Sequence, residues 1–168
     1  LEDTAYFPPR GARALGEWLV MDQAVQAETA DAFYGHTLDR LLACRDLAFA
    51  SVWSPTFFLN LDQRIRERLG HDFTWSDLWP GLALLSCWTD AQSSQWMEEV
   101  AERLGPGVKI QGKGLMATEG VTSVPYPGGS PVLAVSSHFY EFLDPETGDV
   151  TLAHEIAPGS SHAVALTT

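Results

Sequence analysis

Helical and strand-like hydrophobic patterns alternate through the middle of the chain. Apolar residues recur at helical spacing over residues 29–45, 54–70 and 96–104, each time opposite a charged face. Two short, almost wholly apolar runs lie between them, at residues 47–53 and 82–87. Runs of this kind are typical of strands covered on both faces.

Residues 46–112 therefore follow the order strand, helix, strand, helix, strand, with the third strand at residues 108–110. This order favours parallel strands joined by crossover helices. We predict an α/β fold whose parallel or mixed sheet occupies residues 46–119. Ligands of such sheets bind beyond the carboxyl ends of the strands, which would place Trp53, Trp88 and the Thr118–Glu119 pair at one edge.

The pattern changes near residue 120. Short strand candidates separated by glycine, proline and acidic turns fill residues 120–168, which predicts a β-rich, mixed or antiparallel half. Residues 1–27 contain an early Pro-Pro pair, which predicts an irregular lead-in before the α/β part at residues 28–119. We expect residues 1–168 to form a single domain or subdomain.

Charge and cysteine content limit the kinds of partner. The chain has 10 basic and 22 acidic residues in 168, a net charge of -12, so nucleic acid and anionic membranes are unlikely partners. No apolar run approaches the ~20 residues of a membrane span. Cys44 and Cys87 do not form a disulfide framework, and reduced thiols in a cytoplasmic protein are the simplest interpretation.

The stretch Lys113–Gly120 joins two glycines, a hydroxyl and a carboxylate where a strand is expected to end. Leu115 and Met116 are expected to be buried and to hold the Thr118–Glu119 pair firmly. Mg²⁺ usually takes one or two protein carboxylates beside phosphate oxygens, so this pair is a candidate site for a metal and a phosphate. An ordinary strand end and turn is the alternative interpretation.

Two further sets of residues carry candidate chemistry. Trp53 and Trp88 each follow a predicted strand, where they either complete the core or form the floor of an apolar ligand pocket. Cys87 also follows a strand, so a cysteine-dependent hydrolase or transferase is one hypothesis. An inert buried thiol is the alternative for Cys87.

Several blocks of the sequence resemble the auxin-responsive Gretchen Hagen proteins, the acyl-acid amido synthetases, and bacterial members most closely. The blocks are residues 47–57, 78–80, 86–89, 111–120 and 137–142. Their order and spacing also fit, and the likeness covers roughly residues 30–168. The resemblance implies the large domain of an adenylate-forming ligase. It further implies ATP- and Mg²⁺-dependent activation of a small carboxylic acid, followed by transfer of the acyl group to an amino acid.

The resemblance also implies roles for individual residues. Thr118 would meet the nucleotide phosphates, with Ala117 at the position before it, and Glu119 would help to hold Mg²⁺. Phe139 and Tyr140 would lie near the nucleotide. A metal with fixed donors is suited to adenylyl transfer because charge builds up on the phosphate oxygens.

The sequence lacks two motifs of the family pattern and one of the family's domains. Nothing matches the family's upstream Ser/Thr/Gly-rich phosphate loop, and neither its Tyr-Arg-x-Gly-Asp motif nor its carboxyl-terminal cap domain is present. We therefore expect the chain to be an internal fragment of a synthetase that does not turn over ATP by itself. A non-catalytic module that binds a small acid is the competing hypothesis.

Overall fold

The chain divides into two compact units, Leu1–Ile110 and Gln111–Thr168. The computed structural model describes residues 8–11, 13, 19–20, 29–126 and 130–167. Most of the lead-in expected at residues 1–27 falls outside the described residues. The division between the units comes earlier than the change of pattern near residue 120. Each unit is described by itself below.

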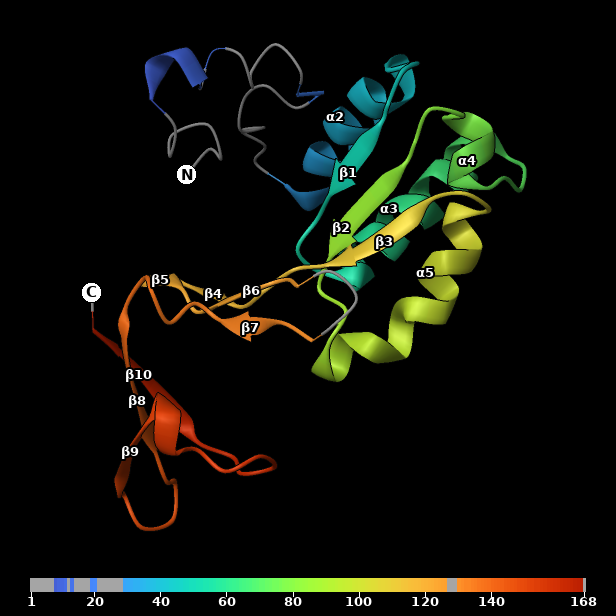
Figure 1. Ribbon diagram of the computed structural model, residues 1–168. Helices are drawn as coiled ribbons and strands as arrows, with labels where there is room; N and C mark the ends of the chain where they lie inside the picture. The colour runs from blue at the N-terminus through green and yellow to red at the C-terminus, as the bar shows by residue number, and fades with distance from the viewer. Residues whose placement is uncertain (1–7, 12, 14–18, 21–28, 127–129, 168) are drawn as a thin grey trace. The chain divides into compact units, whose positions relative to one another are not determined.

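Unit 1 contains a three-stranded parallel sheet. Its strands are β1 (Phe49–Ser51), β2 (Leu84–Cys87) and β3 (Lys109–Gly112), in the order β1-β2-β3. β1 and β2 run parallel, with Phe49 opposite Leu84 and Ser51 opposite Ser86. Figure 1 shows the three strands side by side with helices alongside them. The predicted α/β class and the β-rich second half are both confirmed.

The helices of unit 1 begin and end at residues that carry local signals. They are α2 (Ala30–Ala43), α3 (Pro55–Leu69), α4 (Trp75–Leu78), the 3-10 helix η2 (Ala91–Trp96) and α5 (Met97–Leu104). At the start of α3, the Ser54 hydroxyl accepts a hydrogen bond from the Thr56 amide at 3.2 Å, and proline occupies the first turn. Gly70 ends α3 with φ +72°, a left-handed conformation in which other residues are strained.

The core of unit 1 lies between its helices and its sheet. Phe58, Ile65, Leu85, Val100 and Leu104 are fully buried. Burial of one such side chain contributes about 1.5–3 kcal/mol relative to exposure. The core therefore holds the crossover helices against the strands, and the spacing of these residues is the pattern that predicted the helices.

The prediction that both faces of the first strand are covered is wrong. Phe49 of β1 is 52% exposed, and β1 alternates exposed and half-buried residues. β2 alternates half-buried and buried residues instead. An apolar run indicates that a strand can be buried on both faces, but it does not show that another element covers each face.

Unit 2 consists of short antiparallel strands. They are β4 (Met116–Ala117), β5 (Gly120–Val121), β6 (Ser123–Val124), β7 (Val132–Leu133), β8 (Phe139–Leu143), β9 (Val150–Leu152) and β10 (Ala163–Thr167). β4 pairs with β5, β6 pairs with β7, and β8 lies between β10 and β9. Tyr140 and Phe142 of β8 are buried, while Phe139, the first residue of β8, is 55% exposed. This alternation is the period of two expected for a strand with one covered face.

The Asp144–Asp149 segment forms the turn between β8 and β9, as its composition predicted. The Asp144 amide donates to the Asp149 carbonyl, and the Asp144 carboxylate accepts from the amides of Glu146 and Thr147. In the part of the chain that the structure describes, no helix is both long and apolar enough to cross a membrane.

Candidate functional site

Thr118 and Glu119 form the two-residue loop of the β4–β5 hairpin. Ala117 pairs with Gly120 across this loop, and Met116 pairs with Val121. β4 and β5 form a separate antiparallel pair, so the Thr118–Glu119 turn does not follow a strand of the parallel sheet as predicted. Ala117 is the last residue of β4, directly before this turn.

The apolar residues before this turn are not buried. Leu115 is 57% exposed and Met116 is 47% exposed. Their predicted role as a buried approach to the turn is wrong, since a two-residue strand at the end of a hairpin has little to pack against. Leu115 instead contributes to an open cavity.

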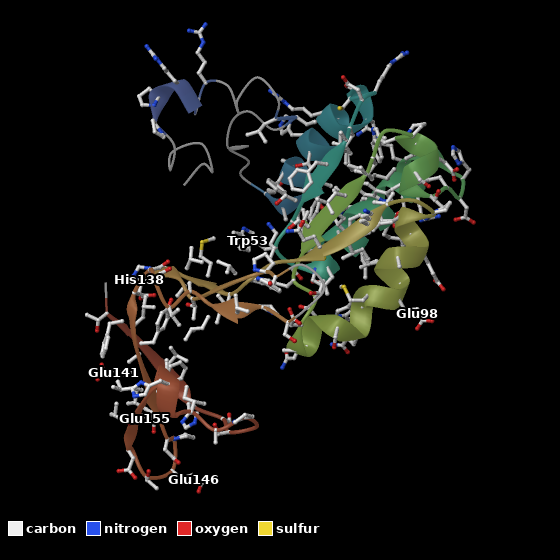
Figure 2. The ribbon with its side chains drawn as sticks, viewed as in Figure 1. Trp53, Glu98, His138, Glu141, Glu146 and Glu155 are labelled. Carbon is white, nitrogen blue, oxygen red and sulfur yellow. The ribbon has the colours of Figure 1, made fainter. Side chains whose placement is uncertain are left out.

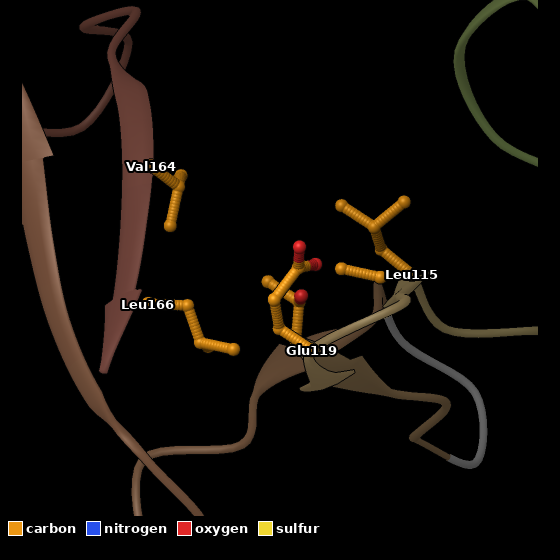
Figure 3. A pocket seen from close by; sticks show the side chains of 6 residues that line it. Leu115, Glu119, Val164 and Leu166 are labelled. Carbon is orange, nitrogen blue, oxygen red and sulfur yellow. The ribbon is translucent and has the colours of Figure 1, made fainter. Parts of the chain in front are cut away.

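A cavity of about 370 Å³ lies beside the turn, and Glu119 is the only charged residue among the described residues that line it. Its lining residues are Leu115, Ala117, Glu119, Thr122, Val164 and Leu166. Figure 3 shows the Glu119 carboxylate pointing into the space between Leu115 and the two β10 residues. Glu119 is thus available to a ligand. Val164 and Leu166 could not be predicted as lining residues because nothing local in the sequence links them to the turn. Thr122 is only three residues after Glu119, but a lone threonine carries no signal of a pocket.

The side chains beside the cavity could hold a metal ion only if a bound molecule supplied further oxygen atoms. No cluster of three or more His, Cys, Asp or Glu side chains occurs among the residues described. Glu119 would supply one hard oxygen ligand, and the Thr118 hydroxyl is next to it in sequence. Mg²⁺ commonly binds one or two carboxylates together with substrate phosphates, and this arrangement provides the protein's share of such a site.

The two glycines that flank the turn allow close contacts within the protein. A Cβ atom on Gly114 would lie 1.9 Å from the Ser123 carbonyl oxygen, so only glycine fits there. A Cβ atom on Gly120 would lie 2.4 Å from His138 Nε2. At both positions the atoms that a side chain would meet belong to the chain itself.

Phe139 and Tyr140 lie on β8 of the same unit, where they differ in exposure. Phe139 is 55% exposed, whereas Tyr140 is 4% exposed. The Tyr140 hydroxyl lies 3.0 Å from the Val121 carbonyl oxygen and 3.2 Å from that of Ala134. Tyr140 therefore contacts the hairpin that carries Glu119, and its hydroxyl is engaged with backbone carbonyls.

Trp53 and Trp88 come together at the carboxyl ends of β1 and β2 in unit 1. Their ring centroids are 5.6 Å apart, and the Trp88 amide donates to the Trp53 carbonyl at 2.9 Å. Trp53 is 44% exposed. The Trp88 indole nitrogen is buried and has no hydrogen-bond partner among the described residues. A buried donor without an acceptor costs about 1–3 kcal/mol, so a ligand oxygen at this nitrogen would be stabilised. Figure 2 labels Trp53 among the side chains of the molecule.

Cys87 is fully buried and belongs to the core of unit 1. Cys44 is half-buried, and neither cysteine takes part in a disulfide. A nucleophilic cysteine has to reach its substrate and is usually partly exposed. The structure therefore offers no support for a reactive Cys87.

The comparisons with known proteins give one informative result. No protein-family model and no curated protein matches the chain. Among solved structures, the chain is similar to "GH3.15 acyl acid amido synthetase" with a TM-score of 0.63 and 16% sequence identity. The alignment covers 89% of this chain and 36% of that one.

A second structure of that enzyme, "AtGH3.15 acyl acid amido synthetase in complex with 2,4-DB", matches with the same TM-score and identity. The alignment covers 84% of this chain and 34% of the other. The chain thus spans about a third of the length of the synthetases it matches. At this identity the likeness shows the fold alone: the chain has the fold of part of these acyl acid amido synthetases.

Proposed function

We propose that the chain is part of an ATP-dependent acyl-acid amido synthetase of the bacterial type. Such an enzyme activates a small carboxylic acid as its adenylate and transfers the acyl group to an amino acid. The proposal joins the motif likeness of the sequence to the fold shared with acyl acid amido synthetases. A cytoplasmic location remains part of the proposal.

One observation carries the proposal: the Glu119 carboxylate points into a cavity in a chain with this fold. In this proposal, Glu119 is an oxygen ligand of Mg²⁺, and Thr118 donates its hydroxyl hydrogen to a phosphate oxygen. Ala117 brings its backbone close to the nucleotide, and Phe139 offers an exposed ring to it. Bound Mg²⁺ would stabilise the charge that develops on the phosphate oxygens during adenylyl transfer.

The charge of unit 2 favours a metal-bound phosphate over a bare one. Residues 111–168 contain one lysine, Lys113, and six carboxylates: Glu119, Glu141, Asp144, Glu146, Asp149 and Glu155. This excess of negative charge repels free ATP. Nucleotide binding to this unit is therefore expected to require the divalent cation.

Calorimetric titration of the chain with ATP, with and without Mg²⁺, tests the proposal. We expect weak binding with Mg²⁺ and none without it. Glu119→Gln should weaken binding about tenfold or more, since a charge-assisted ligand is lost. The control Glu146→Gln removes the same charge from the exposed turn after β8 and should bind as the wild type does. Equal binding by both variants would contradict the proposed role of Glu119.

The acid-binding module is the second candidate, and the Trp53–Trp88 pair favours it. The aromatic pair and the buried indole nitrogen of Trp88 suit a small aromatic or aliphatic acid, whose carboxylate would accept from that nitrogen. Tryptophan fluorescence during titration with a panel of such acids tests this. Acid binding combined with complete indifference to Mg²⁺–ATP would favour the module over the synthetase.

A further inference from the structure

The β4–β5 hairpin is short. Its ladder consists of two residue pairs joined by the Thr118–Glu119 loop, and hydrogen bonds between Leu115 and residues 122–123 lie at its open end, away from the turn. Two-residue loops that match the twist of their strands need a positive φ at one or both loop residues. Neither Thr118 nor Glu119 has a positive φ. A hairpin of this size is marginal alone, so contacts from elsewhere in unit 2 have to hold the turn in place.

Tyr140 supplies the first of these contacts. Its buried hydroxyl lies 3.0 Å from the carbonyl oxygen of Val121 and 3.4 Å from that of Thr122. It also lies 3.2 Å from the Ala134 carbonyl oxygen. A tyrosine hydroxyl has one hydrogen, which these three acceptors share. The hydroxyl therefore ties β5, two residues after Glu119, to the segment that follows β7.

His138 supplies the second contact. Its ring lies against Gly120, where an added Cβ atom would be 2.4 Å from Nε2 and 2.9 Å from Cε1. The same ring meets Tyr140 edge to face, with centroids 6.4 Å apart. His138 lies in the bend just before β8, two residues ahead of Tyr140, and the ring contact places both side chains beside the β4–β5 hairpin. Figure 2 labels His138.

We infer that His138 and Tyr140 are positioning residues that clamp Gly120 and Val121 and so hold the Glu119 carboxylate toward the cavity. The inference rests on the proposed function for the identity of the ligand, but the clamp itself can be tested without any ligand. It gives Tyr140 a role different from nucleotide contact: Tyr140 acts on the site through the backbone of β5.

A double-mutant cycle between Gly120→Ala and His138→Ala tests the contact at Gly120. In the wild-type chain, Gly120→Ala forces a methyl group into the histidine ring and should raise the unfolding equilibrium constant of unit 2 about tenfold or more. In the His138→Ala background, the ring is gone and the same change should have little effect. Chemical denaturation followed by backbone NMR signals of unit 2 measures both. An equal effect of Gly120→Ala in both backgrounds would overturn the inference.

A second set of variants tests positioning independently of that cycle. Tyr140→Phe and His138→Ala should shift the amide NMR signals of Thr118 and Glu119 and weaken Mg²⁺–ATP binding about tenfold. His138→Phe keeps a ring against Gly120 and should restore both properties. The matched controls are Tyr126→Phe, which alters an exposed tyrosine, and His154→Ala, which alters an exposed histidine.

The outcomes separate the clamp from the proposed function. If the wild-type chain does not bind Mg²⁺–ATP, the proposed function fails, while the cycle and the amide shifts still decide whether the clamp exists. If Tyr140→Phe and His138→Ala leave the Glu119 amide signal unchanged, the clamp is refuted even where nucleotide binds. If His138 has only a structural role, His138→Ala should lower stability, but His138→Phe should not restore the amide signals of Thr118 and Glu119.

Discussion

Asp62 shows at the residue scale how unit 1 joins its helices. It is 2% exposed and accepts hydrogen bonds from Arg66 Nε at 2.8 Å and Trp75 Nε1 at 3.0 Å. Arg103 Nη1 of α5 lies 3.7 Å from the same carboxylate. Hydrogen bonds to Asp62 raise the pKa of Arg66. A single carboxylate thus holds donors from α3, α4 and α5.

We predict that Asp62→Asn lowers the free energy of unfolding of unit 1 by about 3 kcal/mol. Removing one partner of a buried ion pair leaves the other charge uncompensated, and such changes typically cost about 3–5 kcal/mol. Asp39→Asn is the matched control, because its ion pair with Arg68 is exposed and should contribute less than about 1 kcal/mol. Urea denaturation measures both, and equal losses would show that the Asp62 network does not stabilise the helices.

At the element scale, the stability of the turn between β8 and β9 is expected to depend on pH. Hydrogen bonds from the Glu146 and Thr147 amides lower the pKa of Asp144 below its ordinary value of 3.8. A carboxyl whose pKa is lower in the folded state stabilises the fold above its unfolded pKa. That stabilisation is lost as pH falls through the folded pKa.

We therefore expect Asp144→Asn to destabilise the β8–β9 hairpin at neutral pH and to lose this effect at low pH. The difference in stability between wild type and variant should be constant above about pH 5 and should shrink as pH falls below 3.8. Hairpin amide signals followed by NMR in a pH titration measure it. A difference that does not change with pH would rule out the carboxylate as its source.

Helix α3 and hairpin β4–β5 show which elements a sequence can predict. The start and end of α3 depend on Ser54, Pro55 and Gly70, which act on their own neighbours, so the sequence was enough to find both. Strands β4 and β5 have two residues each, too few to show a period of two, and the Tyr140 contact to Val121 comes from β8, outside the local pattern. The residues of the Thr118–Glu119 turn were found from sequence, but the sheet to which the turn belongs was not.

The two units differ in buried apolar content at the scale of the whole molecule. The buried apolar cluster, which includes Phe58, Trp75 and Leu85, lies within unit 1. The buried apolar residues described in unit 2 are Ala134, Tyr140 and Phe142. Regions with few buried apolar contacts open more readily, so unit 2 should be the less stable of the two.

Hydrogen exchange should reveal this difference directly. Amides of β2 and α5 in unit 1 should exchange about a hundredfold more slowly than those of β4 and β5, a factor equivalent to roughly 3 kcal/mol. Exchange is followed by NMR at neutral pH. Uniform protection across both units would mean that the chain opens as one cooperative body.

The alternation of strands and helices was enough to predict the α/β class of the whole chain, because each element shows its own period in the sequence. The cavity beside Glu119 could not be predicted in the same way. Val164 and Leu166 reach it from β10, more than forty positions along the chain, and an alternating strand does not indicate which cavity its residues line.

The central claim, that Glu119 holds a metal-bound nucleotide, is tested most directly by replacing Mg²⁺ with paramagnetic Mn²⁺. We predict that Mn²⁺–ATP broadens the amide NMR signals of Thr118, Glu119 and Val121 most strongly, and that Glu119→Gln abolishes this pattern. Broadening that survives in Glu119→Gln, or that centres on the Asp144–Asp149 turn, would contradict the claim.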